Sequence, residues 1–205
     1  MQNLSPRAKI VAGVVAAVVI AMIGFTVGAL TSRPDHPDEG SADVGFARDM
    51  SAHHGQAVEM GMIAFQNATL PEVRTLGGDI AMTQQSQVGM MQTWLKEWGV
   101  GPNGSTPPMS WMPEGQQSLN GNLMPGMATR EEIAKLKAAK GTDLDILFLQ
   151  YMLRHHLGGI HMVDGVLAQN PTQEVRDLAE TMKKNQSGEI TVMQTMLAHL
   201  GAKPL

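Results

Sequence analysis

The sequence predicts an all-α protein in which two copies of a helical hairpin form a four-helix bundle, preceded by one apolar N-terminal helix. Two observations support this prediction. Residues 46–99 align with residues 148–201 at a constant offset of 102 positions, with 15 identities in 54 positions and no gap. In both copies apolar residues recur at alternating steps of three and four, the spacing of an amphipathic helix. Each copy carries two such stripes, so four helices share one core.

The N-terminal segment reads as a membrane anchor. Residues 1–9 carry two basic side chains and precede an uncharged run at residues 10–32, which is long enough to cross a bilayer. The positive-inside rule leaves the N-terminus in the cytoplasm and places the rest of the chain outside, after a linker at residues 33–40. A cleaved signal peptide is the alternative, because residues 27–29 (Val-Gly-Ala) resemble a small-residue cleavage site. That alternative makes the domain a secreted one.

The bundle domain is expected to occupy residues 41–205. Its predicted parts are a hairpin at 41–99, a Met-, Pro- and Gly-rich linker at 100–128, a short helix at 129–140 and a second hairpin at 142–201. Thr129 and Glu132 form a capping box that opens the short helix, and Gly141 is expected to end it. The linker is too long for a turn and predicts a crossover from one end of the bundle to the other. The first and third helices of the bundle are then antiparallel.

Composition narrows the classes of function. The chain has 17 Met and no Cys, which excludes disulfides, thiolate metal sites and haem attached through cysteines. With 19 acidic and 15 basic residues and no basic cluster, nothing indicates a nucleic-acid partner. No nucleophile or acid–base pair stands out, so we expect a protein that is not an enzyme.

A Met-x-x-His-His motif with a further Met six residues beyond the doublet occurs in both copies. On an α-helix these side chains fall within an arc of roughly 120° that faces the core. Buried imidazoles are costly unless each finds a partner, and no acidic residue shares this face. The alternative is ordinary core histidines hydrogen-bonded to glutamine, but the duplicated motif favours metal ligands. The predicted ligands are Met50, His53, His54, Met60, Met152, His155, His156 and Met162.

Copper is the metal that these donors favour. Imidazole and thioether without thiolate suit Cu(I) above all, whereas the Glu-x-x-His pairs of a di-iron bundle are missing from the sequence. Met50 and Met60 stand about 15 Å apart along one helix, so they belong to different sites. If the first and third helices are antiparallel, Met162 approaches Met50 and Met60 approaches Met152. This arrangement predicts two similar sites.

Other residues are candidates for supporting roles. Gln84 and Gln186 interrupt apolar stripes at mid-helix, which indicates a second shell that orients the histidine rings; a solvent-facing polar gap is the alternative. The linker methionines lie among Pro and Gly, where packing demands are weak, and we expect a mobile thioether tract there. The additional candidate ligands are Met91, Met193, His161, Met109, Met112, Met124 and Met127.

The repeated blocks beginning at Phe46 and Phe148, each reading Phe-x-x-x-Met-x-x-His-His, resemble the bacterial family known as domain of unknown function 305. The resemblance spans about residues 41–201. It implies an exported, ferritin-like four-helix bundle linked to copper binding and copper tolerance, with the Met and His residues of the two motifs as ligands. The chain departs from the expected pattern at the small Gly61 and the polar Gln66, which reduce the apolar bulk of the first helix. It also departs at His161, where the first copy has Glu59.

Three functions follow from these features. The leading one is an exported copper-binding protein that acts in copper buffering, trafficking or tolerance. The first alternative is electron transfer through a non-covalent b-type haem, because His and Met are also axial haem ligands. The second is an accessory structural subunit of a membrane complex, with a protein partner in the cell envelope.

Overall fold

The computed structural model describes residues 5–31, 36–113 and 123–205. These residues form six helices and no strand, which confirms the all-α prediction for the part described. The helices are α1 (Pro6–Thr31), α2 (Ala42–Asn67), α3 (Pro71–Glu97), α4 (Arg130–Ala138), α5 (Gly141–Leu167) and α6 (Gln173–His199). The chain divides into two compact units, residues 1–36 with α1 and residues 37–205 with the other five helices.

In the first unit α1 spans 26 residues with mostly aliphatic side chains. A search of the described residues finds no helix that is both long enough and apolar enough to cross a membrane. The anchor predicted at residues 10–32 is not supported by that search.

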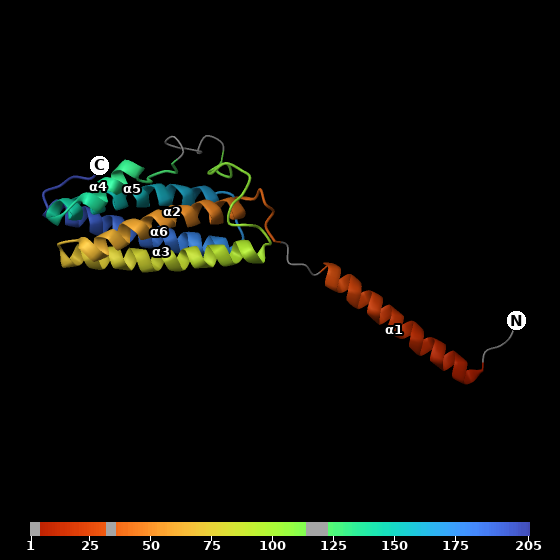
Figure 1. Ribbon diagram of the computed structural model, residues 1–205. Helices are drawn as coiled ribbons and strands as arrows, with labels where there is room; N and C mark the ends of the chain where they lie inside the picture. Colours follow the sequence, from red (N-terminus) through yellow and green to blue (C-terminus); the bar gives the residue numbers. More distant parts are fainter. Residues whose placement is uncertain (1–4, 32–35, 114–122) are drawn as a thin grey trace. The chain divides into compact units, whose positions relative to one another are not determined.

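In the second unit four long helices lie side by side, with α2 against α3, α5 against α6, and α2 against α5 (Figure 1). The short helix α4 contacts α2 and α5 on the face opposite α3 and α6 (Figure 1). Helices α2 and α5 run in opposite directions, as the long crossover predicts. The two copies of the motif therefore face each other head to tail.

Two buried carboxylates fix this antiparallel pairing. Asp43 at the start of α2 accepts hydrogen bonds from the backbone N–H of Thr172, at 2.7 Å, and from its hydroxyl, at 2.8 Å. Asp145 at the start of α5 accepts from the backbone N–H groups of Thr69, at 2.8 Å, and Leu70, at 3.2 Å. Each carboxylate thus satisfies free N–H groups ahead of the second helix of the other hairpin. Asp43 and Asp145 are themselves repeat partners, 102 positions apart.

The arginine of the repeated Glu-Val-Arg triplet closes each hairpin turn. Arg74 donates to the carbonyl oxygen of Ala68 at 2.8 Å, and Arg176 donates to the side-chain oxygen of Asn170 at 2.7 Å. The arginine of the triplet recurs in the sequence for this local structural reason.

The capping box predicted at α4 is present. The Thr129 hydroxyl accepts from the Glu132 N–H at 3.1 Å, and the Thr129 N–H donates to the Glu132 carboxylate at 2.8 Å. The expectation that Gly141 ends this helix is wrong. Helix α4 ends at Ala138, and Gly141 begins α5 with φ +59°, a conformation in which glycine carries no steric penalty.

Two glycines bring α2 and α3 into backbone contact. A Cβ on Gly61 would lie 2.6 Å from the carbonyl oxygen of Gly77, and a Cβ on Gly77 would lie 2.7 Å from that of Gly61. Gly61, a departure from the expected pattern, therefore has a structural reason. The second copy has Val163 and Ala179 at the equivalent positions, so this contact belongs to the first hairpin alone.

Gly77→Ala should lower the free energy of unfolding by about 1–3 kcal/mol, because the added methyl group meets backbone atoms that cannot move aside. Gly89→Ala is the matched control on the same helix, since an added Cβ there meets nothing within 4 Å. The control should be neutral or stabilising, by up to about 1 kcal/mol. Urea unfolding measures both variants, and equal stability of the two would refute the close-contact explanation.

Candidate metal centre

Four histidines meet where α2 crosses the middle of α5. His53 and His54 on α2 and His155 and His156 on α5 are all buried, with at most 1 % of their surface exposed. The rings of His53 and His155 are in contact, with centroids 3.8 Å apart and planes inclined by 33°. We call these two the inner histidines. His54 and His156, the outer histidines, lie 6.5 Å and 6.4 Å from the inner ring of their own doublet.

Each outer histidine bonds to the second helix of its own hairpin. The Nε2 atom of His54 lies 2.8 Å from Oε1 of Gln87 on α3, and the Nε2 atom of His156 lies 2.6 Å from Oε2 of Glu189 on α6. Both partner oxygens are acceptors, so Nε2 is the donor in each ring. Gln87 and Glu189 are repeat partners, and the sequence analysis missed both.

The inner histidines are less well satisfied. His53 donates from Nε2 to the carbonyl oxygen of Pro125 at 3.0 Å. Neither ring nitrogen of His155 makes a hydrogen bond of good geometry with the described residues, although the backbone of His53 lies close enough to oppose, in small part, the lowering of its pKa. The Nδ1 atoms of all four histidines are buried and unpartnered there as well. Each such atom costs about 1–3 kcal/mol when it is left empty. A bound cation is one way to remove that cost.

Burial keeps three of the four imidazoles neutral. It lowers the pKa of His53 to about 4 and that of His54 to about 3, and it holds the pKa of His155 well below 6.5. A metal ion needs the neutral ring, because only a deprotonated nitrogen offers its lone pair. At neutral pH these three rings therefore accept a metal without first losing a proton.

Gln84 and Gln186 are buried but do not make the predicted bonds to the histidine rings in the described part of the chain. Both side chains are 3 % exposed, and their carbonyl oxygens have no partner in the described part of the chain. Gln186 occupies the space that a side chain on Gly159 would fill. Neither glutamine faces solvent, so the alternative of a solvent-facing polar gap is wrong. Their role in orienting the histidine rings stays a prediction. The hydrogen bonds to the outer histidines come instead from residues one helical turn further along.

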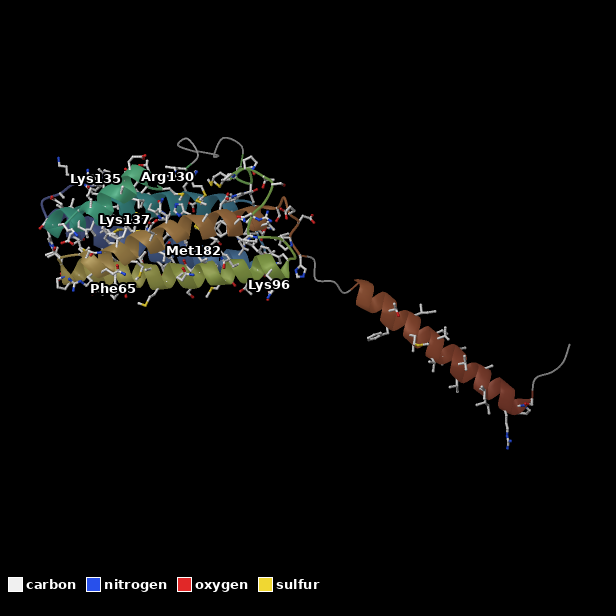
Figure 2. All side chains as sticks on the ribbon, in the orientation of Figure 1. Phe65, Lys96, Arg130, Lys135, Lys137 and Met182 are labelled. Atoms are coloured by element: carbon white, nitrogen blue, oxygen red, sulfur yellow. The ribbon has the colours of Figure 1, made fainter. Side chains whose placement is uncertain are left out.

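The buried methionines divide between the two hydrophobic core clusters of the domain. The methionines of one cluster, which we call the first thioether cluster, are Met50, Met91, Met162 and Met182 together with the linker residues Met109, Met112 and Met124; those of the other, the second thioether cluster, are Met60, Met152 and Met193. Met162 thus joins Met50, and Met60 joins Met152, as the antiparallel arrangement predicts. Figure 2 labels Met182 on α6, where it is fully buried in the first cluster.

The two clusters are not equivalent. Their bundle positions correspond under the repeat, with one exception: Met182 of the first cluster corresponds to Ile80 in the second. The linker adds thioethers to the first cluster only. Met127 is half-buried against the same cluster, whereas His161 is half-buried on α5. Their roles as ligands stay predictions.

The expected mobile thioether tract in the linker is wrong for its described residues. Met109, Met112 and Met124 are buried, with 0 %, 3 % and 7 % of their surface exposed. Asp49 on α2 anchors this segment by accepting from the Met109 N–H at 2.6 Å and the Trp111 indole N–H at 2.7 Å. Specific side-chain contacts therefore override the weak local packing that Pro and Gly predict.

A second part of the linker covers the inner histidines. Gln56 on α2 both donates to and accepts from the backbone of Ala128, at 2.9 Å and 2.7 Å. Gly158 on α5 leaves room for the carbonyl oxygen of Pro125, the same atom that bonds to His53. Gln56 and Gly158 are repeat partners, so one copy supplies a hydrogen-bonding side chain and the other supplies space.

Asp49→Ala should lower the free energy of unfolding by about 2 kcal/mol, because it leaves two part-buried donors without their acceptor. The loss should release Trp111, which then shifts its fluorescence emission to longer wavelength. Asp79→Ala, at an exposed position of α3, is the matched control and should change neither quantity. A native emission spectrum in Asp49→Ala would show that other contacts hold the linker.

The donor set fits a soft metal ion better than a hard one. Within residues 5–31, 36–113 and 123–205, no group of three or more His, Cys, Asp or Glu side chains is arranged to hold a metal ion. The candidate donors in this core are the four buried imidazoles and the methionines of the two hydrophobic clusters. Nitrogen and thioether donors suit copper, and Cu(I) in particular.

Fold and site together define a class of protein: an all-helical domain made from a duplicated hairpin, with a buried layer of histidines between methionine clusters. The chain belongs to the DUF305 family, described as a domain of unknown function, whose pattern matches residues 43–197. No curated protein matches the chain significantly.

Solved structures agree with this assignment. The chain is similar to a putative secreted DUF305 protein from Streptomyces coelicolor, with 43% identity over 82% of this chain and 99% of that chain and a TM-score of 0.76. A DUF305 fragment from Deinococcus radiodurans is 28% identical over 81% and 99% of the two chains, with a TM-score of 0.66. CopM in its Cu(II)-bound form is 26% identical over 77% and 97%, with a TM-score of 0.62.

Proposed function

We propose that residues 37–205 bind copper, with a preference for Cu(I), through the buried histidine layer and its flanking methionines. The observation that carries this proposal is the set of four buried Nδ1 atoms without a partner among the described residues. Such a layer is unfavourable in the empty protein and becomes favourable when a soft cation accepts the lone pairs. A role in copper buffering, trafficking or tolerance, rather than in catalysis, is part of this proposal.

The relatives support the choice of metal and the location. CopM has been solved in Cu(I)-bound, Cu(II)-bound and Ag-bound forms, and the Streptomyces coelicolor protein is described as secreted. We propose by analogy that this domain also acts outside the cytoplasm. We further infer that α2, α3, α5 and α6 act as one ferritin-like four-helix bundle around the metal. The approximate twofold relation between the thioether clusters gives a capacity of about two copper ions.

The haem alternative fits the geometry less well. A haem with one histidine and one methionine as axial ligands needs room for a porphyrin between the two side chains. The inner histidine rings of α2 and α5 are only 3.8 Å apart, so a haem placed between these helices at the histidine layer requires the α2–α5 contact to open.

An anaerobic Cu(I) titration against a competing chelator tests the proposal. The pairs Met50→Leu/Met162→Leu and Met60→Leu/Met152→Leu each remove two thioethers from one cluster while keeping an apolar side chain of similar size. Each pair should weaken Cu(I) binding at least about tenfold, the scale of losing a ligand contribution. Met82→Leu/Met90→Leu is the control, since these side chains are exposed by 69% and 48%. Equal Cu(I) affinity in all of these proteins would reject the proposed sites.

A further inference from the structure

The two outer histidines bond to partners of different charge. His54 pairs with the neutral amide of Gln87, and His156 pairs with the carboxylate of Glu189. The two partners occupy equivalent positions of the repeat, and their distances to the histidines are nearly the same, 2.8 Å and 2.6 Å. The duplicated site is therefore symmetric in geometry but not in charge.

We propose that the centre binds Cu(II) on the side of His156, its second-copy half, because Glu189 bonds to that ring. On the side of His54, the first-copy half, the neutral Gln87 leaves the centre selective for Cu(I). This inference rests on the proposed copper-binding function and deepens it. Glu189 acts as a positioning residue, because it faces the metal only through the imidazole of His156.

Both outer histidine rings are oriented with Nε2 toward the partner residue. Glu189 bonds to Nε2 of His156 and leaves Nδ1, on the other side of the ring, as the nitrogen without a partner in the described residues. The Gln87–His54 pair leaves the same atom free. Both outer histidines therefore present Nδ1 to a metal, and only the group behind the ring differs.

The group behind the ring is a carboxylate at His156 and a neutral amide at His54. A carboxylate bonded to the far nitrogen of a ligating histidine increases the basicity of the ligand, and its negative charge attracts the metal through the ring. Cu(II) carries one positive charge more than Cu(I) and gains more from this attraction. The effect is strong here because the His156 side chain is fully buried, while Glu189 is 23% exposed and reaches the edge of the bundle.

The ion pair between Lys183 on α6 and Asp164 on α5 does not involve Glu189. Lys183 bonds to Asp164 at 2.6 Å, and both side chains are about half exposed. The equivalent positions in the first copy are Ala81 and Met62, which carry no charge. Glu189 is thus a charge in direct contact with His156 that has no counterpart at His54.

A reciprocal exchange in the full chain tests this inference. Glu189→Gln makes the second half resemble the first, and Gln87→Glu makes the first half resemble the second. Glu189→Gln should lower Cu(II) affinity about 10- to 100-fold with little change in Cu(I) affinity. That change is equivalent to a rise in reduction potential of about 60–120 mV. Gln87→Glu should add a second Cu(II) signal in the electron paramagnetic resonance spectrum.

Glu180→Gln is the charge control, because it removes one exposed acidic group from α6 away from the histidines. It should leave both affinities and the spectrum unchanged. Glu189→Gln keeps the size of the side chain and a hydrogen-bond acceptor, so a folded variant is expected and circular dichroism checks it. The conclusion therefore does not depend on Gln87→Glu, which places a charge at a 6% exposed position.

The outcomes separate this inference from the proposed function. Unchanged Cu(II) affinity in Glu189→Gln, or an equal loss of Cu(I) and Cu(II) affinity, overturns the charge-based distinction. In either case Cu(I) binding by the unaltered protein keeps the proposed function intact. If the unaltered protein binds neither ion above the level of nonspecific surface binding, both fail. A selective loss of Cu(II) affinity in Glu189→Gln supports both.

Discussion

Replacing His155 with leucine should make the metal-free protein more stable and at the same time impair copper binding. His155 is fully buried, and neither ring nitrogen has a hydrogen-bond partner in the described residues, so its removal breaks no such bond there. Leucine has a similar volume without polar atoms to desolvate. The free energy of unfolding should rise by about 1–3 kcal/mol in urea titrations of metal-free protein. Cu(I) affinity should fall at least about tenfold.

His54→Leu is the matched comparison. This change also removes one imidazole from the layer, but it leaves the buried Oε1 of Gln87 without its donor. It should lower the stability of the metal-free protein by about 1–3 kcal/mol while weakening Cu(I) binding in the same direction as His155→Leu. Loss of stability in both variants would mean that His155 is well satisfied in the empty protein, contrary to the structure.

Acid should destabilise the metal-free protein between pH 6.5 and about pH 4. The pKa of His53 is lowered to about 4 and that of His54 to about 3, in each case chiefly by burial. In this range the unfolded chain binds protons that the folded protein does not, so stability falls as the pH falls. At about 1.4 kcal/mol for each unit of pKa, His53 alone accounts for about 3 kcal/mol. Urea midpoints measured from pH 7 to pH 4 check this.

The histidine effect is separable from that of the carboxylates. The ion pair with Arg154 lowers the pKa of Glu132, so its contribution is lost only as the pH falls below the ordinary value of 4.5. His53→Leu/His54→Leu should therefore reduce the slope of the profile above pH 5 to the part that His155 contributes, and should leave the loss at lower pH. Bound copper should preserve this dependence in the unaltered protein, because a metal-bound imidazole binds no proton either. A profile with its full slope in the double variant would assign the acid effect to other groups.

The class of fold and the identity of the central donors follow from local sequence. Helices form wherever apolar residues recur at steps of three and four, and Thr129 caps α4 because capping needs only neighbouring residues. The spacing within Met-x-x-His-His places these side chains on one helix face, and all eight predicted ligands are buried. An ungapped repeat also predicts that the two copies meet as equivalents. The repeat also continues to Asp43 and Asp145, three residues before the aligned ranges begin. These two carboxylates fix the antiparallel pairing, so a longer alignment would have contained a signal for it.

The arrangement of these donors depends on contacts between distant segments. Only the packing of α2 on α5 brings His53 against His155, and only packing within each hairpin selects Gln87 and Glu189 rather than Gln84 and Gln186 as partners of the outer histidines. The linker shows the same limit, since Asp49 buries methionines that the local sequence leaves loose. Periodicity fixes which face of a helix a residue occupies. Which residue opposite completes a hydrogen bond depends on the rotation and axial position of the neighbouring helix, and those are decided by tertiary packing.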